Sequence, residues 1–315
     1  MSQHVLLVED NPGDVRLTQE AFRDAAPAVH LHVAADGVET MAFLKREGRH
    51  GAAPRPDLIL LDLSLPKMDG REVLALIKED DDLKTIPTII LTASEAEADI
   101  AKSYRLQANC YLSKPGQLEA FGSLVKSIND FWLIKAKLPQ QKQSQRGGMT
   151  AENVQPSGKE ESDMTKTGRH GVPMNVLLVE DSPGDVRLTQ EAFRDADPAV
   201  RLHVAADGVE AMAFLWRQGR HGDAPRPDLI LLDLNLPRMD GREVLAHIKE
   251  DDGLKTIPTL ILTTSEAEAD IVKSYQLQAN CYLSKPVQFD AFEGLVKSID
   301  DFWLTKAQLP QQKQV

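Results

Sequence analysis

Short apolar runs alternate with longer amphipathic stretches along residues 1–143. The apolar runs predict buried strands at Val5–Val8, His32–Ala34, Leu58–Leu61, Thr88–Leu91 and Cys110–Leu112. The amphipathic stretches carry apolar residues at helical spacing and predict helices at Asp14–Ala25, Met41–Arg46, Arg71–Glu79, Glu95–Leu106 and Gln117–Leu133. Regular alternation of strand and helix predicts an α/β fold, in which helices cover both faces of a five-stranded parallel sheet.

The whole pattern occurs twice. The sequence VLLVED at Val5–Asp10 returns at Val176–Asp181, and LILLDL around Asp62 returns 171 residues later around Asp233. Residues 3–143 align with residues 174–314 without a gap, and about four in five aligned residues are identical. Each copy is long enough to bury its own core. We therefore predict one domain over residues 1–143 and a second over residues 174–315.

Residues 144–173 separate the two copies and differ from them in composition. This segment is rich in Gly, Ser, Thr, Lys and Glu and has few large apolar residues, which predicts a flexible linker. As a random coil of this length it would span about 30 Å, enough to let the domains touch. A passive fusion segment and a tuned spacer remain equally open interpretations.

Composition narrows the class of partner. The chain has 315 residues and a formal net charge of −12 at pH 7, so we do not expect it to bind nucleic acid. Its two cysteines, Cys110 and Cys281, occupy matching positions and are predicted to be small core residues in a reducing compartment. No run approaches the roughly 18 apolar residues of a membrane span. We expect a cytoplasmic protein without membrane contact, whose partners are proteins.

Polar residues follow the predicted strands at the edge where parallel strands place functional sites. In the first copy they are Glu9, Asp10, Asp62, Thr92 and Lys114, and in the second Glu180, Asp181, Asp233, Thr263 and Lys285. Converging carboxylates repel one another, and a hard cation bound by oxygen ligands would relieve this, which favours Mg²⁺. The lysine ammonium and the threonine hydroxyl could both donate to a phosphoryl group at the same edge.

The motifs VLLVED, DLxLPxMDG, LT[AT]S and YLSKP occur in this order in both copies. Through them each copy resembles the receiver domain of two-component response regulators. The resemblance implies a flavodoxin-like (βα)5 fold with strand order 2-1-3-4-5. It also implies that Asp62 and Asp233 accept phosphoryl groups from the phosphohistidine of a sensor histidine kinase. The only chemistry implied is self-catalysed phosphotransfer and autodephosphorylation, so the chain would not be a conventional enzyme.

The resemblance also assigns roles to individual residues. Mg²⁺ would be held directly by Asp10 and Asp62, through water by Glu9, and by the backbone carbonyl of Ser64. In the second copy the equivalent ligands are Asp181, Asp233, Glu180 and the backbone of Asn235. Thr92 and Lys114 would bind the phosphoryl group while Tyr111 turns inward. In the second copy Thr263 and Lys285 would bind it while Tyr282 turns inward. Cis peptide bonds are implied before Pro115 and Pro286.

The phrases NPGDVRLTQEAF, LQANCYLSKP and IxDFWLxKAxLP narrow the resemblance to phytochrome-associated single-domain response regulators. This implies a phytochrome-type sensor kinase and red-light signalling. Regulators of this family often dimerise through the face formed here by the helix at Glu95–Leu106, the strand at Cys110–Leu112 and the helix at Gln117–Leu133. The two copies would pair either within one chain or between chains of a homodimer.

Three functional hypotheses follow. The first is a response regulator without an output domain, acting through protein–protein contacts as a phosphorelay component or phosphate sink with both sites in use. The second is a scaffold in which only one receiver is active, since Ser64 and Ala93 are replaced by Asn235 and Thr264. The third, an Mg²⁺-dependent phosphate-ester hydrolase, is disfavoured because no Asp-x-Asp follows the nucleophile strand.

Overall fold

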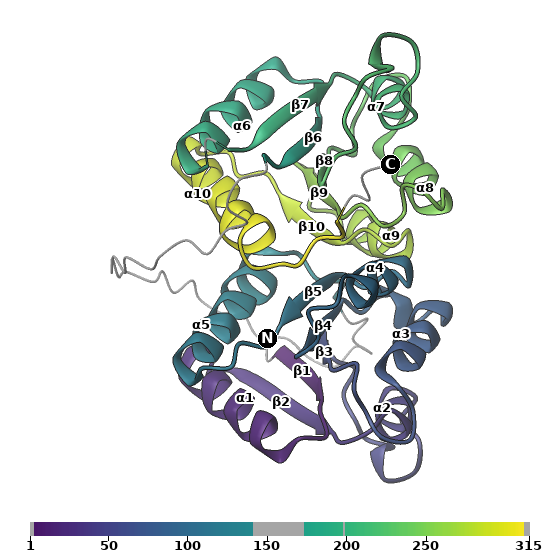
Figure 1. The fold of residues 1–315 in the computed structure, drawn as a ribbon, viewed down its shortest axis with the longest axis vertical. Coiled ribbons are helices and arrows are strands. Elements are labelled where there is room, and N and C mark those ends of the chain that lie inside the picture. Colours follow the sequence, from purple (N-terminus) through teal and green to yellow (C-terminus); the bar gives the residue numbers. More distant parts are fainter. Residues whose placement is uncertain (1–2, 141–172, 198, 312–315) are drawn as a thin grey trace, which may run out of the picture.

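A computed structural model describes residues 3–140, 173–197 and 199–311. They form two α/β halves that are stacked one above the other (Figure 1). The predicted linker at 144–173 lies outside the described residues except for Pro173. No helix within the described ranges is long and apolar enough to cross a membrane.

The first half contains one parallel sheet in the order β2-β1-β3-β4-β5. Its strands are β1 (Gln3–Val8), β2 (Val29–Ala34), β3 (Leu58–Leu61), β4 (Thr88–Thr92) and β5 (Cys110–Ser113). This order confirms the predicted fold. The second strand begins at Val29 rather than at His32, because β1 and β2 pair from Gln3 and Val29 onward. Its half-exposed edge position had hidden this start from the apolar pattern.

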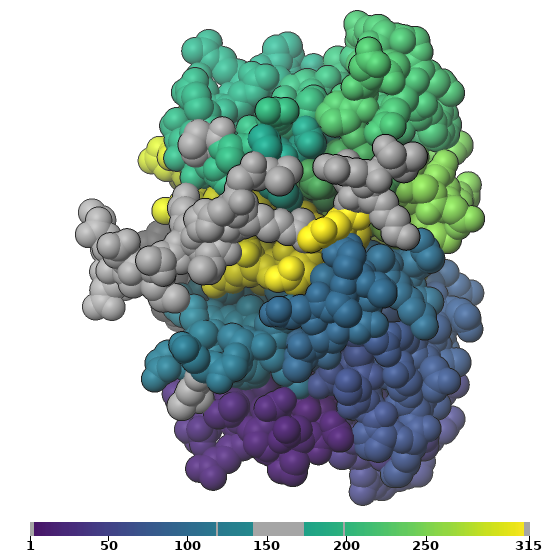
Figure 2. Space-filling model, viewed as in Figure 1, coloured from purple at the N-terminus to yellow at the C-terminus, as the bar shows by residue number. Residues whose placement is uncertain are grey.

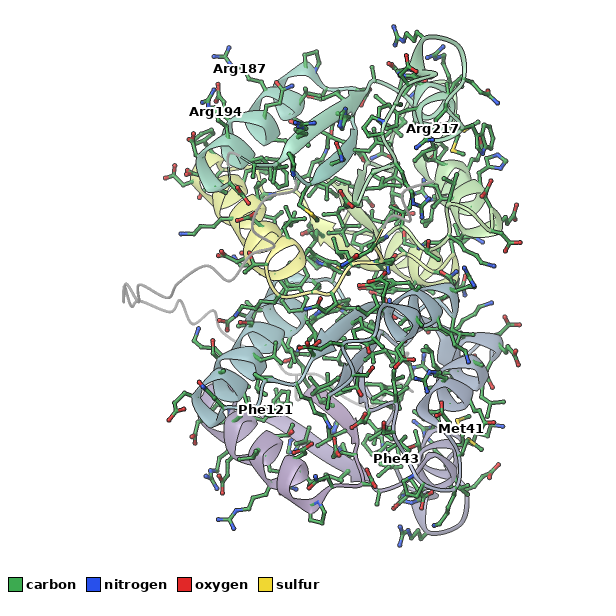
Figure 3. The ribbon with its side chains drawn as sticks, viewed as in Figure 1. Met41, Phe43, Phe121, Arg187, Arg194 and Arg217 are labelled. Carbon is green, nitrogen blue, oxygen red and sulfur yellow. The ribbon has the colours of Figure 1, made fainter. Side chains whose placement is uncertain are left out.

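Helices cover both faces of this sheet, as expected for a parallel sheet. They are α1 (Pro12–Ala25), α2 (Gly37–Leu44), α3 (Gly70–Glu79), α4 (Glu97–Arg105) and α5 (Leu118–Ile128), with short 3₁₀ turns at Gly48–His50 and Leu83–Thr85. Figure 3 shows Phe121 of α5 on one side of the sheet and Met41 and Phe43 of α2 on the other. All three are buried in the two cores that the alternating strand residues create.

The bounds of α1, α3 and α4 differ from the predicted ones by one or two residues, and those of α2 and α5 differ by more. The helix α2 begins at Gly37 rather than Met41, because the Asp36 carboxylate caps it by accepting a hydrogen bond from the Glu39 N–H at 2.8 Å. The predicted helix Gln117–Leu133 is α5 followed by a wider π-helical turn, η3, over Asn129–Lys135. Within η3 the adjacent side chains of Phe131 and Trp132 are both buried.

The second half repeats this architecture with the sheet order β7-β6-β8-β9-β10. Its strands are β6 (Asn175–Val179), β7 (Arg201–Ala205), β8 (Leu229–Leu232), β9 (Thr259–Thr263) and β10 (Cys281–Ser284). Its helices are α6 (Pro183–Ala196), α7 (Gly208–Leu215), α8 (Gly241–Glu250), α9 (Glu268–Gln276) and α10 (Phe289–Ile299), with a 3₁₀ turn at Gly219–His221 and a π turn, η5, at Asp300–Leu304. Arg187 and Arg194 project outward from α6 (Figure 3).

Aromatic side chains of the two π turns meet between the halves. The rings of Phe131 and Phe302 stack at a centroid distance of 4.7 Å and an interplanar angle of 9°. Trp132 and Trp303 lie beside them, with ring centroids 6.2 Å apart. A single cluster of buried apolar residues therefore runs through both halves.

Two buried asparagines also join the halves, each just before the last strand of its sheet. The Asn109 side-chain N–H₂ donates to the carbonyls of Ala279 and Asn280, at 3.2 and 3.1 Å. The Asn280 side chain donates in the same way to Ala108 and Asn109, at 3.2 and 3.0 Å. The contacts are reciprocal, as expected for a near-twofold arrangement.

The segments after the π turns cross from one half to the other. We call residues 136–140 the first tail and residues 307–311 the second tail. The Lys137 N–H in the first tail donates to the Tyr282 carbonyl at 2.8 Å, and the Gln308 N–H in the second tail donates to the Tyr111 carbonyl at 2.8 Å. In Figure 2 the yellow C-terminal segment lies against the blue surface of the first half.

Candidate functional site

Three charged side chains of the first half meet at the carboxyl edge of the sheet. Glu9 follows β1, Asp62 follows β3 and Lys114 follows β5, the places predicted from the strand pattern. Glu9 is 2% exposed and Asp62 is 7% exposed, so both carboxylates are almost removed from water. Carboxylates buried in this way need a compensating positive charge.

The Lys114 ammonium supplies this charge. Its Nζ contacts Asp62 Oδ2 at 2.5 Å, Asp14 Oδ2 at 2.9 Å and Glu9 Oε2. Burial alone would lower the pKa of Lys114, but its hydrogen bonds to Asp62 and Glu9 outweigh burial and raise that pKa. Burial raises the pKa of Glu9, and its contact with Lys114 opposes this rise. The site therefore holds a charged lysine among carboxylates.

The second half assembles the same site. Lys285 Nζ contacts Asp185 Oδ2 at 3.0 Å, and it also contacts Glu180 and Asp233. Asp233 is 6% exposed and Lys285 is 8% exposed. Hydrogen bonds to Asp233 and Glu180 again outweigh burial and raise the pKa of Lys285. The two sites thus share geometry as well as residue identity.

Asp14 and Asp185 belong to these sites although the strand-end argument did not select them. Asp14 lies in the first turn of α1, which Asn11 caps, so its carboxylate is turned back toward the end of β1. The sequence signal was the acid in NPGD, three residues after the cap position. An acid there suits a helix N-terminus in any case, and this had concealed its second role.

The turn after β3 fixes the direction of the Asp62 side chain. The Ser64 N–H donates to Asp62 Oδ1 at 3.1 Å, and the Gly70 N–H donates to the Leu63 carbonyl at 3.0 Å. A Cβ atom added to Gly70 would lie 2.1 Å from the Asp62 carbonyl oxygen, so only glycine fits this close approach. Asn235 and Gly241 repeat both features in the second half.

The predicted metal ligands are only partly gathered. Glu9 and Asp62 converge on one point, but Lys114 Nζ lies between them, and Asp10 is exposed. Asp181 is likewise exposed in the second half. Among the described residues, no group of three or more His, Cys, Asp or Glu side chains is arranged to hold a metal ion.

Thr92 and Tyr111 lie where the sequence predicted them. Thr92 ends β4 and is 1% exposed, and Thr263 is fully buried at the end of β9. The Tyr111 hydroxyl donates to the Ser94 carbonyl at 2.9 Å, and its side chain is already fully buried. Tyr282 bonds to Ser265 in the same way. The inward tyrosine position that was expected only after phosphorylation is thus present here in both halves.

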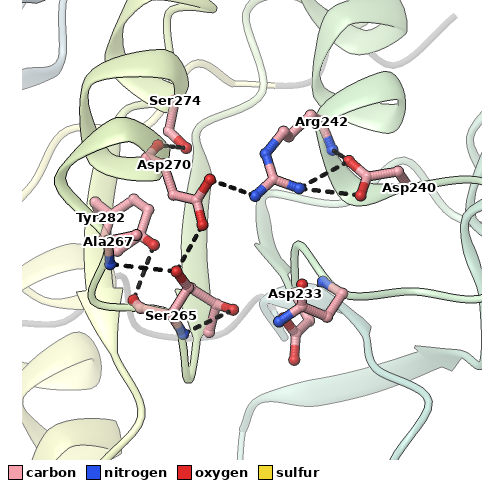
Figure 4. Close-up of polar contacts among 10 residues, drawn as sticks. Asp233, Asp240, Arg242, Ser265, Ala267, Asp270, Ser274 and Tyr282 are labelled. Atoms are coloured by element: carbon pink, nitrogen blue, oxygen red, sulfur yellow. Dashed lines mark hydrogen bonds and ion pairs between the residues drawn. The ribbon is translucent and has the colours of Figure 1, made fainter.

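A polar network beside each site was not predicted. In the second half Ser265 Oγ donates to Asp270 Oδ2 at 2.6 Å, and Asp270 also accepts from Arg242, which contacts Asp240 at 3.0 Å (Figure 4). The Ser265 hydrogen bond helps to lower the pKa of Asp270, with Arg242 adding to the effect. This network ties the loop after β9 to α8 and α9. Ser94, Asp99, Arg71 and Asp69 form its counterpart in the first half.

The predicted cis peptide bonds are wrong. No cis bond occurs in the parts of the chain that the structure describes, so the bonds before Pro115 and Pro286 are trans. With the trans bond the Lys114 N–H donates to the Thr92 carbonyl at 2.7 Å, and the Lys114 side chain still reaches Asp62. A trans bond is also the lower-energy isomer before proline.

Comparison with known proteins identifies the family of both halves. The model of the response regulator receiver domain matches residues 5–126 and again residues 176–297. Response regulator Rcp1 from Synechocystis sp. is 49% identical over 138 residues, which cover 44% of this chain and 94% of Rcp1. Response regulator PleD from Caulobacter vibrioides is 24% identical over 300 residues, which cover 95% of this chain and 59% of PleD.

Solved structures resemble one half at a time. The phosphorylated cyanobacterial phytochrome response regulator RcpA is 48% identical, covers 44% of this chain and 100% of its own, and has a TM-score of 0.43. The two family matches together cover well over half of the chain. The chain therefore belongs to the response regulator receiver domain family, with two receivers in one polypeptide that are related to phytochrome response regulators.

Proposed function

We propose that this chain is a tandem response regulator that accepts phosphoryl groups on Asp62 and Asp233. The observation that carries the proposal is the buried contact of each aspartate with a lysine at the carboxyl edge of its sheet. The same contacts occur in both halves, which supports two active acceptors over a scaffold with one. The receivers would correspond to residues 1–143 and 174–315, joined by the linker.

The chemistry needs alignment and charge neutralisation rather than further covalent groups. An Asp62 carboxylate oxygen would attack the phosphorus of a phosphohistidine. An O–P bond forms, the N–P bond breaks, and the histidine leaves as neutral or protonated imidazole. Lys114 would offset the growing negative charge on the phosphoryl oxygens, and Thr92 would donate to them. Attack by water on phosphorus later restores the carboxylate and releases phosphate.

The side chains present fit a hard divalent cation such as Mg²⁺. Glu9 and Asp62 offer carboxylate oxygens close to one point, and Asp10 and the Ser64 carbonyl lie on the adjoining turns. In the second receiver the ligands would be Glu180, Asp181, Asp233 and the backbone of Asn235. A bound cation would supply additional positive charge near the phosphoryl oxygens. A solved structure described as the Mn²⁺-bound form of Rcp1 accords with this.

The phosphodonor is proposed to be a sensor histidine kinase of the phytochrome type. The support is the relation to Rcp1 and to RcpA, which is described as a phytochrome response regulator. Output would pass through protein–protein contacts, as suits a signalling protein rather than a conventional enzyme. Pairing of the receivers within one chain, through α4, β5 and α5 and their partners α9, β10 and α10, is part of the proposal. Light scattering should then give a mass near 34.8 kDa at every concentration.

Phosphorylation of single-site variants tests the function. The chain is incubated with Mg²⁺ and either acetyl phosphate or a phytochrome-type kinase with ATP, and base-labile phosphate is counted. We expect Asp62→Asn and Asp233→Asn each to lose about half of the label, and the double variant to lose nearly all of it. Undiminished labelling of the double variant would contradict the proposal.

A further inference from the structure

The two tails contact the elements that carry the predicted switch residues of the opposite receiver. The second tail binds the first receiver at the Tyr111 carbonyl in the middle of β5 and, through the Gln311 N–H, at the Glu97 carboxylate in the first turn of α4. The first tail binds the second receiver at Tyr282 and, through the Gln140 N–H, at Glu268 Oε1 at 2.7 Å. The anchoring is therefore reciprocal.

The anchored residues connect to the acceptor sites inside each receiver. The Tyr111 hydroxyl holds the Ser94 carbonyl, two residues beyond Thr92 on the loop that leaves β4. Thr92 in turn pairs through its carbonyl with the N–H of Lys114, the residue that contacts Asp62. A rearrangement of the β4–α4 loop on phosphorylation would thus reach Tyr111 directly and, through its carbonyl, the tail of the other receiver.

The tails also have little freedom to absorb such a rearrangement locally. Each one follows a π turn whose aromatic pair is buried in the shared apolar cluster, with Phe131 and Phe302 stacked on each other. The Asn109–Asn280 contacts fix the base of β5 against the base of β10. Tightly packed interfaces of this kind tend to switch between discrete arrangements rather than deform gradually.

We propose that the two acceptor sites are coupled through the crossed tails, so that a phosphoryl group on one receiver favours loading of the other. This inference rests on the proposed phosphoacceptor function. The sign follows from the reciprocal contacts. Each tail meets the same elements of the opposite receiver. When both receivers are phosphorylated, or both are not, the two tail contacts are equivalent; when only one is phosphorylated, one of the two tail contacts is strained.

Intact mass spectrometry of the full chain, incubated with acetyl phosphate and Mg²⁺, resolves molecules with none, one or two phosphoryl groups. We use the ratio of two quantities: the product of the unloaded and doubly loaded fractions, and the square of the singly loaded fraction. If the two sites are loaded independently, this ratio cannot exceed about one quarter, however unequal the sites are. We expect this ratio to exceed that ceiling, by about fivefold or more at a typical coupling strength.

The matched variants separate the tail contacts from other effects. Lys137→Pro with Gln308→Pro removes both tail N–H donors and should bring the ratio down to the ceiling or below. Lys137→Ala with Gln308→Ala keeps the donors and should leave it high. Proline is compatible with the preceding residue Ala136, whose φ of −69° and ψ of 142° are extended. Should the proline chain fail to fold, Glu97→Ala with Glu268→Ala removes the exposed side-chain acceptors and should lower the ratio.

Each outcome is decisive. Wild-type chains that label at both sites but stay at or below the ceiling would overturn the coupling and leave the phosphoacceptor function standing. A high ratio that persists in the folded proline or glutamate variants would overturn the role of the tails. Absence of labelling at both sites would overturn the proposed function and the coupling with it.

Discussion

The charged sites of the two receivers have equivalent contacts, whereas the loops beside them carry different side chains. Lys114 and Lys285 contact equivalent sets of carboxylates. Just beyond them Gly116 is replaced by Val287, which is fully exposed, and Leu118 is replaced by Phe289, which is 52% exposed. An exposed apolar pair beside one site alone costs solubility without adding to the core.

The sequence differences between the two receivers are unevenly distributed. The charged residues of the two sites are identical, and so are the asparagines and aromatic residues that join the halves, whereas Lys137 of the first tail is replaced by Gln308 in the second. Some of the changes are buried, such as Ile89 to Leu260, and others are exposed, such as Lys45 to Trp216, whose side chain is 43% exposed. The receivers would thus share the proposed chemistry while presenting different exposed side chains to a partner.

The largest expected effect lies at the interface that the receivers share. Phe302→Ala should lower the free energy of unfolding by about 3–5 kcal/mol, because it empties a buried aromatic site. Phe131→Ala should cost a similar amount, since the two rings stack on each other. Urea unfolding followed by far-UV circular dichroism measures both. Phe43→Ala, in a core away from the interface, controls for a general loss of core volume. If Phe302→Ala alone is harmless, the halves are not packed together as described.

A second effect concerns two lysines at the same interface. Lys78 Nζ donates to Asn109 Oδ1 and Lys249 Nζ to Asn280 Oδ1, both at 2.8 Å. Burial lowers the pKa of both to about 7, and Lys249 adds to the effect on Lys78. Each lysine side chain is half-buried, and its ammonium group donates to one of the two asparagines that join the halves.

The direction in which stability changes with pH follows from proton binding. Between the folded pKa near 7 and the ordinary value of 10.5, the unfolded chain binds more protons than the folded chain, so stability should rise with pH across this window. We expect a rise of about 1 kcal/mol per lysine between pH 7 and pH 8, and a flatter profile in Lys78→Met with Lys249→Met. Urea unfolding at the two pH values checks it. Identical profiles in wild type and variant would show that neither lysine is held neutral.

The fold was largely accessible to sequence reasoning, and the reasons are local. Strands such as Leu58–Leu61 are buried on both faces, so they appear as uninterrupted apolar runs. The acceptor and lysine positions followed from the strand ends. Asp14 was missed because an acid in a first helical turn already has an ordinary explanation. The cis bonds before Pro115 and Pro286 were expected from the family resemblance, not from the residues themselves, and trans is the ordinary isomer. The contacts of the two tails depend on tertiary packing, for which neither periodicity nor composition gives a signal.

The smallest expected effect tests the divergence of the surfaces. Val287→Gly with Phe289→Leu gives the second receiver the loop of the first. Labelling of Asp233 by a histidine kinase should change by less than about tenfold, because exposed side chains contribute about 1 kcal/mol or less to such a contact. Labelling by acetyl phosphate should not change, since the small donor does not meet this surface. Equal changes in labelling by the kinase and by acetyl phosphate would show that the loop affects phosphoryl transfer itself rather than the choice of partner.

The number of phosphoryl groups that one chain can carry distinguishes two active receivers from one. Intact mass spectrometry of the full-length protein, loaded to saturation with acetyl phosphate and Mg²⁺, should show chains with two base-labile phosphoryl groups. Peptide mapping should place them on Asp62 and Asp233. Saturation at a single group, or groups on other residues, would show that Asp62 and Asp233 are not both phosphoryl acceptors.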